Sequence, residues 1–133
     1  MTMNKSKTYT VFLVDDDAIF MDMLKESFSD KANMIIHSFY SGEDCLANLN
    51  LNPDVIVLDY FFSKAGEKAI DGMETLKKIV AANPKINVVM LTAQNEGDKV
   101  YEFIHEGAKD YVIKDLDAFE NVLSAVTGIL EEL

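Results

Sequence analysis

The chain contains no arginine: all 12 of its basic residues are lysines, against 23 acidic residues, and its formal net charge at pH 7 is -11. Arginine is the usual reader of guanine, and a strongly acidic chain repels phosphates, so we expect no direct contact with nucleic acid. A single cysteine, Cys45, excludes an internal disulfide and permits a reducing compartment. No apolar run approaches the roughly 20 residues of a membrane span. The sequence therefore predicts a cytoplasmic protein without membrane contact.

The sequence also lacks internal repeats, low-complexity stretches and linkers that would divide it. Its 133 residues are enough for one hydrophobic core and too few for two. We therefore expect a single domain over residues 1–133, with its core from about residue 9 to residue 130.

Four short apolar runs each end on a side chain that can take part in chemistry. The runs cover residues 11–14, 55–58, 88–91 and 111–113. Such runs indicate strands that are buried on both faces of a parallel sheet. The residues that follow them are Asp15, Asp16 and Asp17, then Asp59, then Thr92, then Lys114. Because open parallel sheets bind ligands at the carboxyl ends of their strands, we expect one crevice that holds a divalent cation, accepts a phosphoryl group and neutralises it.

Segments with helical periodicity alternate with the strands. They cover residues 18 to about 30, 41–49, 73–83, 96–105 and 117 to the C-terminus, and a further strand is expected over residues 33–39. In the first helix, Phe20, Leu24 and Phe28 recur every four residues, with Ile19 and Met23 beside them. The alternation predicts an α/β fold: a doubly wound five-stranded parallel sheet of flavodoxin-like order 2-1-3-4-5, with helices on both faces.

Taken together, these motifs resemble the receiver domain of two-component response regulators over about residues 9–130. The matching segments are Phe12–Asp16, Pro53–Asp59, Asp71–Gly72, Val89–Ala93 and Gly107–Lys114. The resemblance implies that Asp59 is the phosphoacceptor. It also implies that Asp15 and Asp16 organise Mg²⁺ (or Mn²⁺), with Asp59 and the backbone carbonyl of Phe61 completing the protein ligands.

The resemblance assigns roles to three further residues. Thr92 and Lys114 would contact the phosphoryl oxygens, and the rotamer of Tyr111 would report the state of Thr92. The partner face would lie on the fourth helix, the fifth strand and the last helix, where its candidate members are Val100, Tyr101, Lys109, Tyr111 and Phe119.

A chain of this family would take a phosphoryl group from a histidine kinase or a phosphotransfer protein. It would catalyse only its own phosphorylation and dephosphorylation, and it would not be an enzyme acting on a separate metabolite. Its signal would pass to a downstream protein, if it is a stand-alone receiver, or to an output domain, if it is the N-terminal part of a longer regulator.

Two other functions compete with this one. Asp15 and Asp17 after the first apolar run, with Thr92 and Lys114 later, loosely fit a haloacid-dehalogenase-like phosphatase that uses Asp15 as its nucleophile. That fold usually needs a later acidic pair and a longer chain. The second alternative is a receiver-like binding module that is never phosphorylated, against which the complete set of site residues argues. For Asp17 itself we favour the role of a helix N-cap.

Three features depart from the family pattern. The stretch from Asp59 to Asp71 is about five residues longer than usual. Lys114 is followed by Asp115 where the family usually has proline, so we expect a trans bond, because a cis non-proline bond costs about 2.5–4 kcal/mol. Phe61 and Gln94 occupy positions that the family varies to tune hydrolysis of the phosphoryl group.

Overall fold

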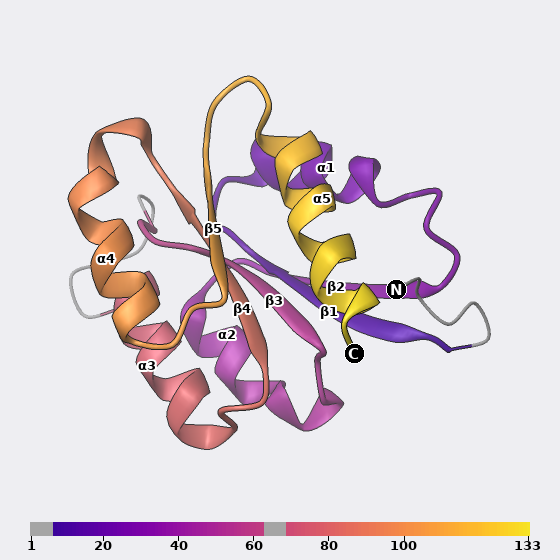
Figure 1. The fold of residues 1–133 in the computed structure, drawn as a ribbon, viewed down its shortest axis with the longest axis horizontal. Coiled ribbons are helices and arrows are strands. Elements are labelled where there is room, and N and C mark those ends of the chain that lie inside the picture. Colours follow the sequence, from indigo (N-terminus) through magenta and orange to yellow (C-terminus); the bar gives the residue numbers. More distant parts are fainter. Residues whose placement is uncertain (1–6, 63–68) are drawn as a thin grey trace.

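The computed structural model describes residues 7–62 and 69–133, which form one parallel sheet with helices on both faces (Figure 1). The strand order is β2-β1-β3-β4-β5, and every pairing is parallel. The strands are β1 (Tyr9–Val14), β2 (Met34–Phe39), β3 (Val55–Asp59), β4 (Asn87–Thr92) and β5 (Asp110–Ile113). The helices are α1 (Ala18–Ser27), α2 (Gly42–Ala47), α3 (Gly72–Ala82), α4 (Gly97–His105) and α5 (Ala118–Glu131). The predicted fold class and strand order are confirmed.

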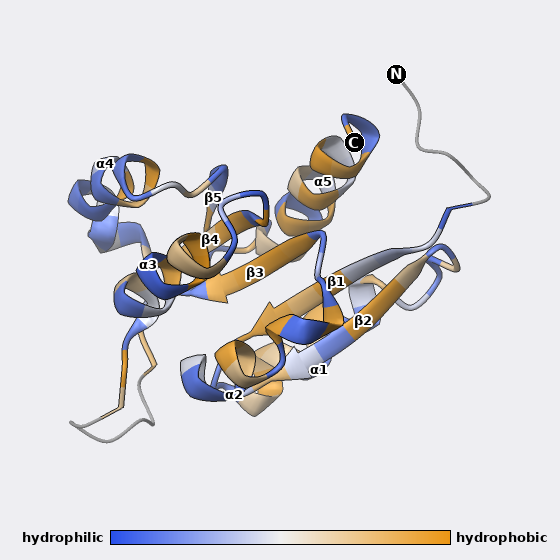
Figure 2. Ribbon diagram, turned by 90° about the horizontal axis from the view of Figure 1, so that it is seen from below, coloured by the Kyte–Doolittle hydropathy of each residue, from blue (hydrophilic) through white to orange (hydrophobic). Residues whose placement is uncertain are grey.

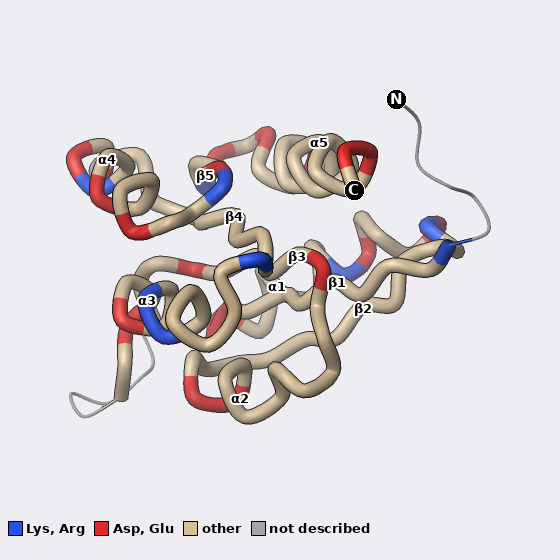
Figure 3. The backbone as a smooth tube through the Cα atoms, turned by 60° about the horizontal axis from the view of Figure 1, so that its bottom comes forward, with Lys and Arg blue, Asp and Glu red and all other residues tan. Residues whose placement is uncertain are grey.

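Alternation along the strands divides the core into two layers. Val11 and Leu13 of β1 pack with α1 and α5, whereas Phe12 and Val14 face the side covered by α2, α3 and α4. The central strands are buried on both faces, and they are coloured mainly as hydrophobic in Figure 2. Acidic residues lie mostly on the helices and connecting loops (Figure 3). Among the described residues, no helix is long and apolar enough to cross a membrane.

The first helix differs from its prediction in length and in its buried face. It ends at Ser27, not near Asp30, because the N–H groups of Phe28 and Ser29 bond back to carbonyls three residues earlier and tighten the chain into a turn. Met21, Leu24 and Phe28 are the buried residues, at spacings of three and four. Ile19 and Met23, expected beside this stripe, are 75% and 52% exposed.

The other helices begin close to their predicted starts. Ser41 caps α2 by accepting a hydrogen bond from the Asp44 N–H, but α2 ends at Ala47, and a separate 3-10 turn (Leu49–Leu51) follows it. The side chain of Asn48 donates to the Asp44 carbonyl and closes the helix. A second 3-10 turn (Gln94–Glu96) precedes α4, so this helix starts one residue later than expected.

Candidate functional site

Three carboxylates meet at the carboxyl ends of β1 and β3. The two strands are direct neighbours, with Val14 paired to Leu58, so the residues that follow them emerge side by side. Asp15 is fully buried and Asp59 is 4% exposed, whereas Asp16 is half-buried. One carboxylate oxygen from each residue lies within 4.8 Å of the others. The sheet therefore gathers the three aspartates that the sequence placed at one edge.

Lys114 joins two of these carboxylates. Its Nζ lies 2.7 Å from Oδ2 of Asp15 and 3.3 Å from Oδ1 of Asp59. The backbone N–H of Lys114 donates to the Thr92 carbonyl at 2.8 Å, which fixes the start of the loop after β5 against the end of β4. Thr92 is buried, and its hydroxyl oxygen has no hydrogen-bond partner within the described part of the chain. A buried hydroxyl without a hydrogen-bond partner costs free energy, so the Thr92 hydroxyl can donate to an acceptor that binds in this site.

A cavity of about 340 Å³ opens onto this cluster. Its lining residues are Asp15, Asp16, Asp17, Asp59, Tyr60, Phe61, Thr92, Ala93, Glu96 and Lys114. All six candidate residues for phosphoryl transfer and metal binding thus line one cavity. Phe61 lines this cavity and is 67% exposed.

The buried charges shift one another's pKa. Burial, and after it the neighbouring Asp15 charge, raise the pKa of Asp59 to about 7, although Lys114 partly offsets both effects. Burial likewise raises the pKa of Asp15. For Lys114, burial lowers the pKa, but the carboxylates of Asp59 and Asp15 outweigh it, so its pKa rises and the ammonium stays charged. The cluster thus carries excess negative charge that a divalent cation would relieve.

Asp17 caps α1, as predicted. Its Oδ1 accepts hydrogen bonds from the N–H groups of Ile19 (3.0 Å) and Phe20 (3.1 Å), and its own N–H donates to Oδ1 of Asp15.

The peptide bond between Lys114 and Asp115 is trans, as expected without a proline, since no described peptide bond is cis.

Two aromatic residues make contacts that the sequence did not predict, although Phe20 packs against the core as expected. Phe119 was a candidate for the partner face, but its ring packs against Phe20 of α1, with centroids 5.0 Å apart. Phe20 was assigned to the core stripe, yet its ring also lies 4.4 Å from Nζ of Lys114. No spacing rule links residues 20 and 114, so only the tertiary structure reveals this contact.

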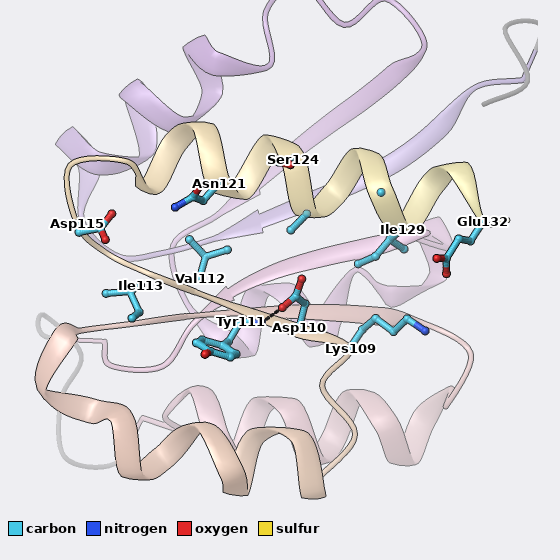
Figure 4. Close-up of a pocket in the computed structure, with 12 residues that line it drawn as sticks. Lys109, Asp110, Tyr111, Val112, Ile113, Asp115, Asn121, Ser124, Ile129 and Glu132 are labelled. Carbon is cyan, nitrogen blue, oxygen red and sulfur yellow. Dashed lines mark hydrogen bonds between the residues drawn. The ribbon is translucent and has the colours of Figure 1, made fainter. Parts of the chain in front are cut away.

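Tyr111 lies on the edge strand β5, where it is 40% exposed. Figure 4 shows its ring on the side of β5 away from α5, whereas Val112 points towards α5. A hollow of about 650 Å³ lies between β5 and α5, and Tyr111 is among the residues that line it. The ring of Tyr111 points to the α4 side, and its backbone pairs with Met90, two residues before Thr92 in β4.

Sequence comparison identifies the family. Residues 11–127 match the model of the response regulator receiver domain. The chain belongs to this family. Receiver domains are signalling domains of two-component systems, they interact with histidine kinases and output domains, and they bind Mg²⁺ through an acidic cluster, which the Asp15, Asp16 and Asp59 group fits. Membership removes the support for the dehalogenase-like alternative.

Curated relatives include short and long proteins. Chemotaxis protein CheY of Listeria monocytogenes is 30% identical over 116 residues, which are 86% of this chain and 92% of that protein. Protein CcdB of Bacillus subtilis is 32% identical over 123 residues, 91% of this chain and 98% of that protein. The transcriptional regulatory protein ZraR of Salmonella typhimurium is 32% identical over 107 residues, 80% of this chain but only 23% of that protein.

Solved structures show the same fold. The receiver domain of NtrX from Brucella abortus superimposes with a TM-score of 0.77 at 23% identity, covering 90% of this chain and 97% of that one. A CheY-like response regulator receiver domain protein from Methanospirillum hungatei gives a TM-score of 0.78 at 20% identity, covering 95% and 96%.

Proposed function

We propose that this receiver domain takes a phosphoryl group from the phosphohistidine of a histidine kinase or phosphotransfer protein onto Asp59, with Mg²⁺ or Mn²⁺ bound beside it. The observation that carries the proposal is the position of Lys114, whose ammonium bridges Asp15 and Asp59 at the floor of the cavity. A cation held there neutralises charge on the nucleophile and on an incoming phosphoryl group alike.

The donor set fits a hard divalent cation. Carboxylate and carbonyl oxygens with several waters are the ligands that Mg²⁺ prefers. Asp15, Asp16 and Asp59 would hold the ion, together with the backbone carbonyl of Phe61, whose residue lines the same cavity. When bound, the ion supplies positive charge to the carboxylates and to the phosphoryl oxygens.

The transfer itself needs alignment more than covalent assistance. A carboxylate oxygen of Asp59 forms a bond to phosphorus while the bond from phosphorus to the imidazole nitrogen breaks, and the electron pair of that bond stays on the imidazole. Lys114 neutralises the charge that spreads over the phosphoryl oxygens. The Thr92 hydroxyl, which lacks a partner among the described residues, donates to one of them. The product is an acyl phosphate, whose hydrolysis limits the duration of the signal.

We further propose that phosphorylation changes a protein-binding surface through Thr92 and Tyr111. Thr92 would move towards the phosphoryl group, and the half-exposed Tyr111 would turn inward on the α4 side. The resulting surface would bind a downstream protein or an output domain. The chain would act as a single cytoplasmic domain, without direct contact to nucleic acid or membrane, and would catalyse only its own phosphorylation and dephosphorylation.

Phosphorylation by a small donor tests the assignment of Asp59. With phosphoramidate or acetyl phosphate and Mg²⁺, intact-mass spectrometry should show the addition of one phosphoryl group, which Asp59→Asn abolishes. Asp22→Asn, which removes an exposed carboxylate of α1, should be labelled like wild type. Labelling that survives in Asp59→Asn and disappears in Asp15→Asn would identify Asp15 as the nucleophile. A wild-type chain that is never labelled would instead support the binding module that carries no phosphate.

A further inference from the structure

Lys114 contacts a third group that is not an oxygen. Its Nζ lies 4.4 Å from the centroid of the Phe20 ring, in addition to its ion pairs with Asp15 and Asp59. The negative face of an aromatic ring attracts an ammonium within about 6 Å, and the attraction grows as water is excluded. Only 24% of the Lys114 side chain is exposed, so the ring and the carboxylates together enclose most of it.

Phe20 is held both at its backbone and at its ring. The Phe20 N–H donates to Oδ1 of Asp17 at 3.1 Å, which ties the residue to the N-cap of α1. On the other side, its ring packs on Phe119 in the first turn of α5, with an interplanar angle of 33°. Both rings are partly buried against the core layer of α1 and α5. The pair therefore forms a fixed apolar support beside Lys114, which precedes α5 by a short loop.

The Phe20 ring and the two carboxylates are affected differently by the proposed reaction. If the proposed function holds, the oxygens of Asp15 and Asp59 are shared with the cation, and Asp59 becomes an acyl phosphate. Mg²⁺ takes oxygen ligands, and a phenyl ring offers none, so neither the ion nor the phosphoryl group competes for Phe20. A lysine side chain is a flexible stem with a point charge at its end, so a contact that does not change during the reaction can fix its orientation while its anionic partners change.

We propose that Phe20, supported by Phe119, is a positioning residue that holds the Lys114 ammonium over the phosphorylation site while the carboxylates bind the cation and the phosphoryl group. The inference rests on the proposed function for its effect on the reaction. The contact between the ring and the ammonium is a separate matter, which can be measured without any reaction.

Fluorinated phenylalanines at position 20 separate this role from simple packing. Each added fluorine weakens the negative face of the ring while its shape changes little. With phosphoramidate and saturating Mg²⁺, we expect the phosphorylation rate of Asp59 to fall stepwise with fluorine number. We expect Phe20→Leu to be about two- to fivefold slower than wild type, and Phe20→Tyr to retain most of the rate. The matched control is the same fluorinated series at Phe28, which is buried at the opposite end of α1 and should show no trend.

A second readout needs neither metal nor phosphate. In the metal-free protein, the ring current of Phe20 should shift the ε-methylene proton resonances of Lys114 upfield, and Phe20→Leu should remove this shift while changing the melting temperature no more than Phe28→Leu does. The inference would be overturned by a phosphorylation rate that is constant across the fluorinated series. It would also be overturned if Phe20→Leu left the chemical shift of the Lys114 ε-methylene protons unchanged. If wild type takes up no phosphoryl group at all, the proposed function fails, while the Lys114 resonance still decides the contact.

Discussion

Removal of the Asp59 charge should stabilise the metal-free protein, and the gain should grow with pH. The folded-state pKa of Asp59 is raised from 3.8 to about 7, first by burial and then by the Asp15 charge. Between these two values, the folded state binds more protons than the unfolded state, so the free energy of unfolding of wild type falls as pH rises. Above pH 7 the full cost of an ionised Asp59 is present. Asp59→Asn has no such cost at any pH.

The size of the effect follows from the shift. The pKa of Asp59 rises from 3.8 to about 7, and each tenfold change in proton affinity corresponds to about 1.4 kcal/mol. At pH 8, an ionised Asp59 therefore lowers the free energy of unfolding by on the order of 4 kcal/mol. At pH 5.5, roughly half of this cost has developed, because Asp59 is then largely protonated in the folded state and ionised in the unfolded state. The stability gain of Asp59→Asn should therefore be about 2 kcal/mol larger at pH 8 than at pH 5.5. Asp59→Asn leaves Asp15 in place, so the Lys114 ammonium still has a carboxylate partner, which lies 2.7 Å away in wild type.

Urea unfolding in the presence of EDTA, at both pH values, measures this difference directly. Asp22→Asn is the matched control, because it removes an exposed carboxylate of α1 that does not line the cavity. With saturating Mg²⁺ the gain should shrink, because the ion binds more tightly to the chain that retains all three carboxylates. A gain that is equal at pH 5.5 and pH 8, or a loss of stability at pH 8 without metal, would refute the reasoning from buried charge.

Two further outcomes are expected. Millimolar Mg²⁺ should raise the melting temperature of wild type by mass action. Asp16→Asn should reduce this rise, and it should also raise the melting temperature of the metal-free protein. A wild-type melting temperature that does not change with Mg²⁺ would contradict a metal site. Beryllium fluoride with Mg²⁺ should shift the NMR resonances of the Tyr111 ring and of the α4 amides, and Thr92→Ala should suppress both changes. If the Tyr111 resonances do not change and the shifts are confined to Tyr60, Phe61 and their neighbours, the signal would pass through the loop after Asp59 instead.

The sequence predicted the sheet and the convergence of the site because both depend on local patterns. Apolar runs bounded by polar residues located the strands, and the order of a parallel sheet then placed Asp59 beside Asp15. The buried face of α1 was less predictable, because Ile19 and Met23 are as apolar as Met21, and only packing against the sheet decides between them. The contact of Phe20 with Lys114 was not predictable at all, since it joins two elements far apart in the chain.

The long connection after β3 leaves the proposed phosphorylation site in place because the structure fixes both of its ends. The Tyr60 N–H donates to the Leu91 carbonyl, and the Tyr60 carbonyl accepts from the Gly72 N–H at 2.9 Å. Gly72 approaches β3 so closely that a Cβ at this position would lie 2.2 Å from the carbonyl oxygen of Asp59, so only glycine fits there.

A second tie reaches the returning end of the connection from another helix. The Ile70 N–H donates to Oε2 of Glu43 in α2 at 3.2 Å, two residues before Gly72 begins α3. Of the connection itself, residues 63–68 lie outside the described part of the chain. Additional residues inserted between two fixed ends lengthen the loop without moving those ends, and loop closure becomes only slowly more costly with length. The carboxylate of Asp59 therefore keeps the position that β3 and Gly72 give it, while the hydrogen bonds of Tyr60 and Ile70 hold the described ends of the connection.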